Sequence, residues 1–119
     1  MALKILTIDD DPAMTELIGL LLRSHGMEVI TSNDGERGIQ LARTEAPDLI
    51  LLDMMMPGTD GWKVCRSIRA FSKVPIAVLS ALDESLVISS ALDAGADDYL
   101  VKPIPSGVLI AHINNLTRR

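Results

Sequence analysis

DLILLDMMMPGTDGW, residues 48–62, is the most informative segment of this sequence. Its apolar residues 49–52 form a continuous run, which is typical of a parallel strand that helices cover on both faces. Further short runs rich in apolar and β-branched residues occupy 4–8, 27–31, 76–79 and 99–101. Stretches with apolar residues at helical spacing separate these runs, so a strand–helix unit repeats five times. The pattern predicts an α/β domain with a five-stranded parallel sheet and helices on both faces.

Helix start and stop signals follow the predicted strands. Asp11 is suited to cap a helix that Pro12 opens, and Gly26 is suited to end that helix. The remaining helices are expected to begin at Asp34, Asp60, Asp83 and Ser106, and the helix from Asp83 is expected to end at Gly95. Each helix that joins two strands then makes a right-handed crossover between them.

Length, charge and composition restrict the class of protein. The 119 residues, 48% of them apolar, suffice for one core, so we expect a single domain over residues 1–119 with no output domain in this chain. The net charge of −5 and the dispersed basic residues argue against direct binding of nucleic acid. No signal peptide and no apolar run of about 20 residues is present, so we expect a cytoplasmic protein without membrane association. The lone cysteine, Cys65, excludes an internal disulfide and is expected in the core.

Chemically active side chains follow four of the five predicted strands. These side chains are Asp9, Asp10, Asp11, Asp53, Ser80 and Lys102. In an open parallel sheet the carboxyl ends of the strands meet at one edge, where ligands bind. Carboxylates gathered there repel one another and are costly to bury, so they imply a cation. Oxygen ligands that face a phosphate group favour Mg²⁺, since Ca²⁺ needs more oxygen ligands.

Each of these residues also has a simpler interpretation. Asp11, directly before Pro12, is best explained as a helix cap. A single serine after a strand is usually a turn residue, and a single lysine before proline usually lies in a solvated loop. The combination of three carboxylates, a hydroxyl and an ammonium group at one edge is instead typical of a site for phosphoryl transfer.

The segments KILTIDDD, DLILLDMMMPGTDGW, IAVLSA and GADDYLVKP resemble the receiver domain of two-component response regulators, over essentially the whole chain. They are closest in pattern to the receivers of winged-helix transcription factors. The resemblance implies the flavodoxin-like strand order 2-1-3-4-5 and a switch activated by phosphorylation. It also implies Mg²⁺ as the cofactor, and a sensor histidine kinase or phosphotransfer protein as the partner.

The resemblance assigns a role to each matching residue. Asp53 would accept the phosphoryl group, Lys102 would pair with its charge, and the Ser80 hydroxyl would bind one of its oxygens. Tyr99 matches the aromatic residue that swings inward, and the peptide bond before Pro103 is expected to be cis. The metal site would comprise Asp9 (through water), Asp10, Asp53 and the backbone carbonyl of Met55.

Three other classes of protein fit part of this pattern. An aspartyl-nucleophile phosphohydrolase would need a second acid two residues after Asp53, where this chain has Met55. A flavodoxin-like electron carrier would need a phosphate-binding loop after the first strand, where three aspartates would repel its ligand. A scaffold that works without phosphorylation would not need the complete set of acid, hydroxyl and lysine. The hydrolase and the scaffold remain as alternatives.

Two positions that tend to gate water in this family are apolar here. Met55 lies two residues after Asp53, and Leu82 lies two residues after Ser80. Neither side chain offers water a strong hydrogen bond. We therefore expect slow self-dephosphorylation.

The resemblance also implies a homodimer through the helix from Asp83, the strand 99–101 and the helix from Ser106. A charged pair that crosses this dimer in similar receivers is replaced by Ile88 and Val108. At least one residue of 86–88 should point away from the core, because three consecutive helical residues span about 200°. A second charged pair becomes Asp98 with His112, which is charge-assisted only when the imidazole is protonated.

Overall fold

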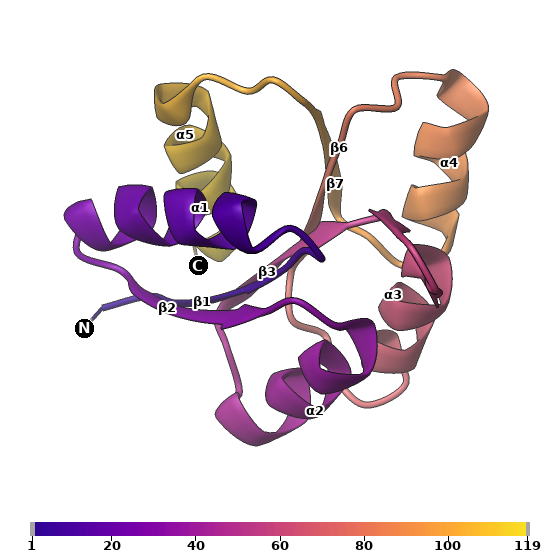
Figure 1. Ribbon diagram of the computed structural model, residues 1–119, viewed down its shortest axis with the longest axis horizontal. Coiled ribbons are helices and arrows are strands. Elements are labelled where there is room, and N and C mark those ends of the chain that lie inside the picture. Colours follow the sequence, from indigo (N-terminus) through magenta and orange to yellow (C-terminus); the bar gives the residue numbers. More distant parts are fainter. Residues whose placement is uncertain (1, 119) are drawn as a thin grey trace.

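The predicted apolar runs form one parallel sheet (Figure 1). The computed structural model describes residues 2–118. Its main sheet comprises β1 (Lys4–Ile8), β2 (Glu28–Ser32), β3 (Leu49–Asp53), β6 (Ile76–Ser80) and β7 (Asp98–Val101). The order across the sheet is β2-β1-β3-β6-β7, and all neighbours are parallel. Counted along this sheet, the order is the predicted 2-1-3-4-5.

Helices cover both faces of the sheet. They are α1 (Pro12–Ser24), α2 (Gly35–Glu45), α3 (Gly61–Arg69), α4 (Ser85–Asp93) and α5 (Ser106–Thr117). Helices α1 and α5 pack on one face, and α2, α3 and α4 pack on the other (Figure 1). Alternate strand residues point to opposite faces, so Leu6 and Ile8 lie in the core beneath α2 to α4, whereas Ile5 lies beneath α1 and α5. The central strands β3 and β6 are buried along their whole length, as predicted.

Three of the four aspartates predicted to begin helices do so. The side chains of Asp11, Asp34 and Asp60 each accept a backbone N–H from the first turn of the following helix. The prediction for Asp83 was wrong, because α4 begins only after Glu84, whose side chain makes no capping hydrogen bond. The main chain of Leu82 is held by the Ser80 and Tyr99 hydroxyl groups, and the helix begins after this segment.

The structure also contains a short hairpin that the sequence did not predict. Strands β4 (Met55–Met56) and β5 (Thr59–Asp60) pair antiparallel directly after β3, around Gly58 at φ +72°. Two-residue strands are too short to produce a detectable alternation of apolar and polar residues. The hairpin fixes Met55 beside Asp53, at the edge where the predicted site lies.

Two further sequence predictions concern burial and membranes. Cys65 is fully buried in α3 among apolar side chains, as expected. Within residues 2–118, every helix is too short or too polar to cross a membrane.

Candidate functional site

Four strand ends bring the predicted site residues to one edge of the sheet. Asp9 directly follows β1, Asp53 is the last residue of β3, Ser80 is the last residue of β6, and Lys102 directly follows β7. Asp9, Asp53 and Ser80 are all buried, and Lys102 is partly exposed. The carboxyl edge of the sheet therefore carries two buried acids, a buried hydroxyl and an ammonium group.

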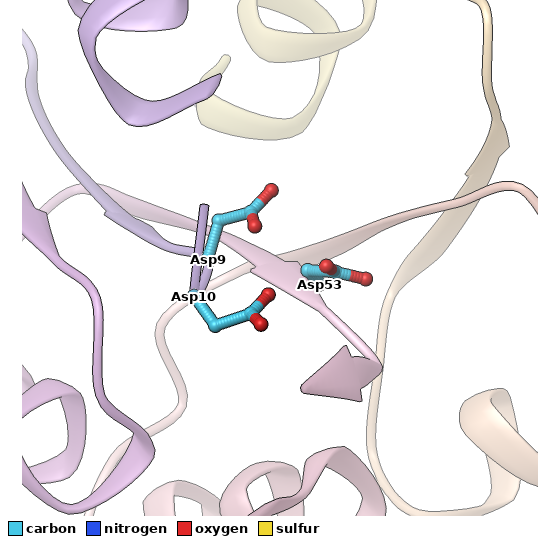
Figure 2. A group of neighbouring side chains, drawn as sticks. All are labelled: Asp9, Asp10 and Asp53. Carbon is cyan, nitrogen blue, oxygen red and sulfur yellow. The ribbon is translucent and has the colours of Figure 1, made fainter. Parts of the chain in front are cut away.

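Three carboxylates gather at the centre of this edge. One carboxylate oxygen from each of Asp9, Asp10 and Asp53 lies within 4.8 Å of the other two. Figure 2 shows the side chains of Asp9 and Asp10 extending toward the end of β3 that carries Asp53. Asp11 is not part of this group; its carboxylate accepts the backbone N–H of Ala13 at 3.0 Å, which is the capping role expected of it.

Asp9 is held in place from both sides. Its carboxylate accepts the backbone N–H of Asp11 at 3.0 Å. Its backbone carbonyl accepts the Asn33 side-chain amide at 2.8 Å, and that amide also donates to the Thr15 hydroxyl at 3.1 Å. Asn33 follows β2, the one strand to which the sequence assigned no role at the site. A polar residue at a strand end was the available signal, but Asn33 precedes the cap Asp34 and reads as part of a turn.

The surroundings of Asp53 disfavour its ionised form. Burial is the largest cause and raises the pKa of the Asp53 carboxyl above its ordinary value, and the nearby Asp9 carboxylate raises it further. The Met55 backbone N–H, which donates to Asp53 Oδ1 at 3.0 Å, and the Lys102 ammonium group lower the pKa but do not cancel the rise. The site thus holds more negative charge than its own groups neutralise. A divalent cation with oxygen ligands fits this excess.

Lys102 provides positive charge beside the acids. Its Nζ lies 3.5 Å from Asp9 Oδ2. Its backbone N–H donates to the Ser80 carbonyl at 2.8 Å, which ties the loop after β7 to the end of β6. The peptide bond between Lys102 and Pro103 is cis, as expected.

Leu82 links two predicted switch residues through its main chain. Ser80 Oγ accepts the Leu82 backbone N–H at 3.1 Å. The Tyr99 hydroxyl donates to the Leu82 carbonyl at 2.7 Å, while its ring packs half-buried against the core. The loop between β6 and α4 is therefore held by one hydroxyl from β6 and one from β7. A change at Ser80 can reach Tyr99 through a single residue.

A groove runs from the site along the face that carries α1 and α5. It has a volume of about 640 Å³ and an almost wholly apolar lining, which includes Leu17 and Leu21 of α1 and Leu109 of α5. Lys102 also lines this groove, so the groove opens beside the acidic cluster. Leu17 is 63% exposed. The sequence did not predict this feature, because it depends on how two distant helices pack.

Four exposed apolar side chains belong to α4, β7 and α5. We call the surface of these three elements the α4–β7–α5 face; the four side chains are Leu86, Leu92, Val101 and Val108. Leu86 is 81% exposed, so one residue of 86–88 does point away from the core, and Ile88 is half-buried. On the same elements His112 Nδ1 lies 2.7 Å from Asp98 Oδ2, in the pairing expected from the sequence.

A family model and curated proteins both match nearly the whole of this chain. A family model described as the response regulator receiver domain matches residues 5–114. The transcriptional regulatory protein AfsQ1 of Streptomyces coelicolor is 44% identical over 98% of this chain, and the DNA-binding response regulator MtrA of Mycolicibacterium smegmatis is 40% identical over all of it. The chain spans about half the length of these curated relatives, 52% in each case.

Solved structures also superpose closely on this chain. The BeF₃-activated N-terminal receiver domain of Klebsiella pneumoniae RstA superposes with a TM-score of 0.92 at 38% identity, covering 98% of this chain and 99% of that one. A two-component response regulator from Clostridium difficile superposes with a TM-score of 0.94 at 32% identity, covering 98% and 97%.

Proposed function

The chain belongs to the response regulator receiver domain family, and on that basis we propose that it accepts a phosphoryl group on Asp53 and signals through a change of surface. The observation that carries this proposal is the meeting of three carboxylates, a serine hydroxyl and a lysine at four strand ends. The curated relatives of this chain are named as regulatory proteins. We propose that the only reactions it catalyses are its own phosphorylation and dephosphorylation.

The residues present suit Mg²⁺. Asp10 and Asp53 would bind it directly, Asp9 would bind it through water, and the backbone carbonyl of Met55 would complete the protein's share. Once bound, the ion would supply positive charge to the phosphoryl oxygens in the transition state. The excess negative charge around Asp53 supports this assignment.

The attacking atom follows from the hydrogen bonds of the carboxylate. Asp53 Oδ1 accepts the Met55 backbone N–H and keeps a second lone pair for the metal, so we assign the attack to Oδ2. It forms a bond to the phosphorus of a phosphohistidine, and the bond from phosphorus to the imidazole nitrogen breaks. Lys102 is suited to stabilise the charge on the transferring group, because its ammonium lies 3.5 Å from Asp9 and lowers the pKa of Asp53 by its charge.

The switch would work through the loop between β6 and α4. The Ser80 hydroxyl now accepts the Leu82 N–H, and its own proton can be donated to a phosphoryl oxygen when the side chain turns toward Asp53. Leu82 then loses a partner and its loop can move, and the Tyr99 hydroxyl follows because it holds the Leu82 carbonyl. The surface altered in this way would be the α4–β7–α5 face.

Two surfaces suit two partners. The apolar groove beside Lys102 suits a sensor histidine kinase or phosphotransfer protein, because a protein seated there brings its phosphohistidine to the acidic edge. The α4–β7–α5 face suits a second activated copy of the chain. The longer relatives are named as DNA-binding regulators; here we assign residues 1–119 to the receiver role alone, without contact to nucleic acid.

Incubation with acetyl phosphate and Mg²⁺, followed by intact-mass measurement, tests the proposal. A stable gain of one phosphoryl group that maps to Asp53 and is absent from Asp53→Asn is the expected result. Sustained hydrolysis of acetyl phosphate would point to a phosphohydrolase, and no reaction would point to a scaffold that works without phosphorylation.

A further inference from the structure

Three consecutive methionines follow Asp53, and they differ in exposure. Met54 and Met56 are 1% and 5% exposed, whereas Met55 is 55% exposed. Among the other methionines that the structure describes, Met27 is 9% exposed and Met14 is half-buried. Oxidants reach exposed thioethers far more easily than buried ones. The fold therefore offers one methionine of residues 2–118 to a soluble oxidant and protects its two neighbours.

The exposed methionine is fixed beside the phosphoacceptor. The backbone N–H of Met55 donates to Asp53 Oδ1 at 3.0 Å. Pairing of β4 with β5 sets Met55 opposite Asp60, so the main chain is held from two directions. The Met55 side chain borders a shallow cavity of about 400 Å³ that Trp62 also lines. The exposed side chain of Met55 thus extends from a backbone that is hydrogen-bonded to the proposed phosphoacceptor.

We propose that Met55 is a peroxide-sensitive modification site whose oxidation shortens the life of the phosphoryl group on Asp53. This inference rests on the proposed function. The peroxide transfers one oxygen atom to the thioether sulfur: the sulfur–oxygen bond forms, the O–O bond of hydrogen peroxide breaks, and water leaves. Sulfur is oxidised by two electrons and the peroxide is reduced. Methionine sulfoxide reductases reverse the change.

The consequence follows from the hydrogen bonds of the two forms. The thioether of Met55 is only a weak hydrogen-bond acceptor. The side chain of Leu82, which is half-buried, has no polar atom that could bind water. Loss of the phosphoryl group requires a water molecule to attack phosphorus, and an apolar border does little to orient it. A sulfoxide oxygen is a strong acceptor on the same border. It can bind and orient the attacking water, so hydrolysis should become faster.

Peptide mapping tests the site. The metal-free domain is treated with graded hydrogen peroxide in the presence of a chelator, and fragmentation of the peptide spanning residues 44–63 separates the three methionines. We expect sulfoxide on Met55 at doses that leave Met54 and Met56 unmodified. Oxidation of Met54, Met56 or Met14 at the same rate as Met55 would overturn the assignment.

The lifetime of the phosphorylated state tests the consequence. After removal of peroxide, the domain is phosphorylated with acetyl phosphate and Mg²⁺, and decay is followed by intact mass. Each protein is compared with its own untreated sample. Oxidised wild type should lose its phosphoryl group several-fold faster, treatment with sulfoxide reductase should restore the slow decay, and Met55→Leu should decay equally with and without peroxide.

A second variant separates polarity from oxidation. Met55→Gln places a permanent acceptor at this position and should decay faster than Met55→Leu without any peroxide. Equal decay of oxidised and untreated wild type would overturn the inference while leaving the proposed function intact. Failure of the untreated domain to accept a phosphoryl group would instead contradict the proposed function, and this inference with it.

Discussion

Asp53, the proposed phosphoacceptor, lies where its negative charge is unfavourable unless a cation binds beside it. Two unit charges about 5 Å apart repel by roughly 3 kcal/mol at an effective dielectric constant of 20, and Lys102 offsets part of this. Without metal, we expect Asp53→Asn to stabilise the domain by about 1 kcal/mol, or about 4 °C in Tm. The amide keeps an oxygen that can accept the Met55 N–H. Thermal unfolding in a chelator measures the difference.

The pH dependence of this difference has a defined sign. The pKa of Asp53 is higher in the folded chain than its ordinary value of 3.8, so the folded domain holds the proton more tightly. Protonated Asp53 therefore favours the folded state, and this contribution to stability is lost as the pH rises from the pKa of Asp53 in the unfolded chain through its pKa in the folded domain. The Tm advantage of Asp53→Asn should be small near about pH 4 and reach a plateau toward neutral pH. Saturating Mg²⁺ should remove it, and an advantage independent of pH and Mg²⁺ would contradict this account.

Asn33 is a residue whose importance only the structure revealed. Its amide joins the carbonyl of Asp9 to the Thr15 hydroxyl, so Asn33→Ala leaves both without that donor. We expect a loss of about 1–2 kcal/mol in the free energy of unfolding, and a fall of about tenfold in Mg²⁺ affinity because Asp9 is less well oriented. Chemical denaturation and amide NMR titration measure the two effects. Asn114→Ala, on the exposed surface of α5, is the control and should change neither.

We expect a long-lived phosphorylated state because the positions of Met55 and Leu82 are apolar. Replacing both with groups that can orient water, Met55→Asn with Leu82→Glu, should speed the loss of the phosphoryl group at least several-fold. Positioned polar groups that assist proton transfer typically contribute a factor of about 100 or more. Intact-mass decay after removal of acetyl phosphate gives the rate. An unchanged lifetime in the double variant would refute the gating role of these positions.

At the scale of elements, α4 is held less firmly than the helices around it. It buries one residue, Ala91, whereas α3 buries four and α5 buries two. Glu84 gives it no side-chain cap, and the loop before it depends on two hydroxyl groups from β6 and β7. A weakly packed helix next to a movable loop is suited to report a change at the site, because little packing must be broken to shift it.

Tyr99→Phe tests this connection. The change removes the hydroxyl that holds the Leu82 carbonyl, which should destabilise the loop by about 1 kcal/mol. Amide hydrogen exchange from Leu82 through α4 should then rise roughly fivefold, since each 1.4 kcal/mol corresponds to tenfold. Amides of α1 are the internal control. A uniform increase over the whole chain would indicate global destabilisation and would contradict the link.

The strands and helices also show which features of the structure can be predicted from the sequence. The buried run 49–52 predicted a central parallel strand, and the site followed because parallel strands deliver their last residues to one edge. The cap of α4 was predicted incorrectly: Asp83 is an acid suited to cap a helix, but the cap residue is Glu84, whose side chain makes no capping hydrogen bond. The hairpin β4–β5 and the contact of Asn33 with Asp9 depend on three-dimensional proximity that no periodicity encodes. The residue types were predictable, and the contacts between distant residues were not.

Within residues 2–118, the exposed large apolar side chains lie in three parts of the molecule. Leu17 and Leu20 lie on α1, Met55 lies at the site, and the other four lie on the α4–β7–α5 face. An apolar contact on this face would favour association, because burying an aliphatic side chain contributes about 1.5–3 kcal/mol, more than an exposed ion pair at about 0–1 kcal/mol. The replacement of a charged pair by Ile88 and Val108 therefore need not weaken a dimer.

The size of the activated domain tests this. With beryllium fluoride in place of the phosphoryl group, we expect a dimer by light scattering that persists at high salt, since its central contact is apolar. Val108 is 44% exposed, so Val108→Glu brings a charge into that contact and should give a monomer. Adding Ile88→Arg should restore the dimer by pairing the two charges across the interface. Leu20→Glu, on α1 and outside the α4–β7–α5 face, should leave the dimer unchanged. Three identical masses for wild type and the two Val108 variants would exclude this face, because a contact through it should respond to a charge at Val108.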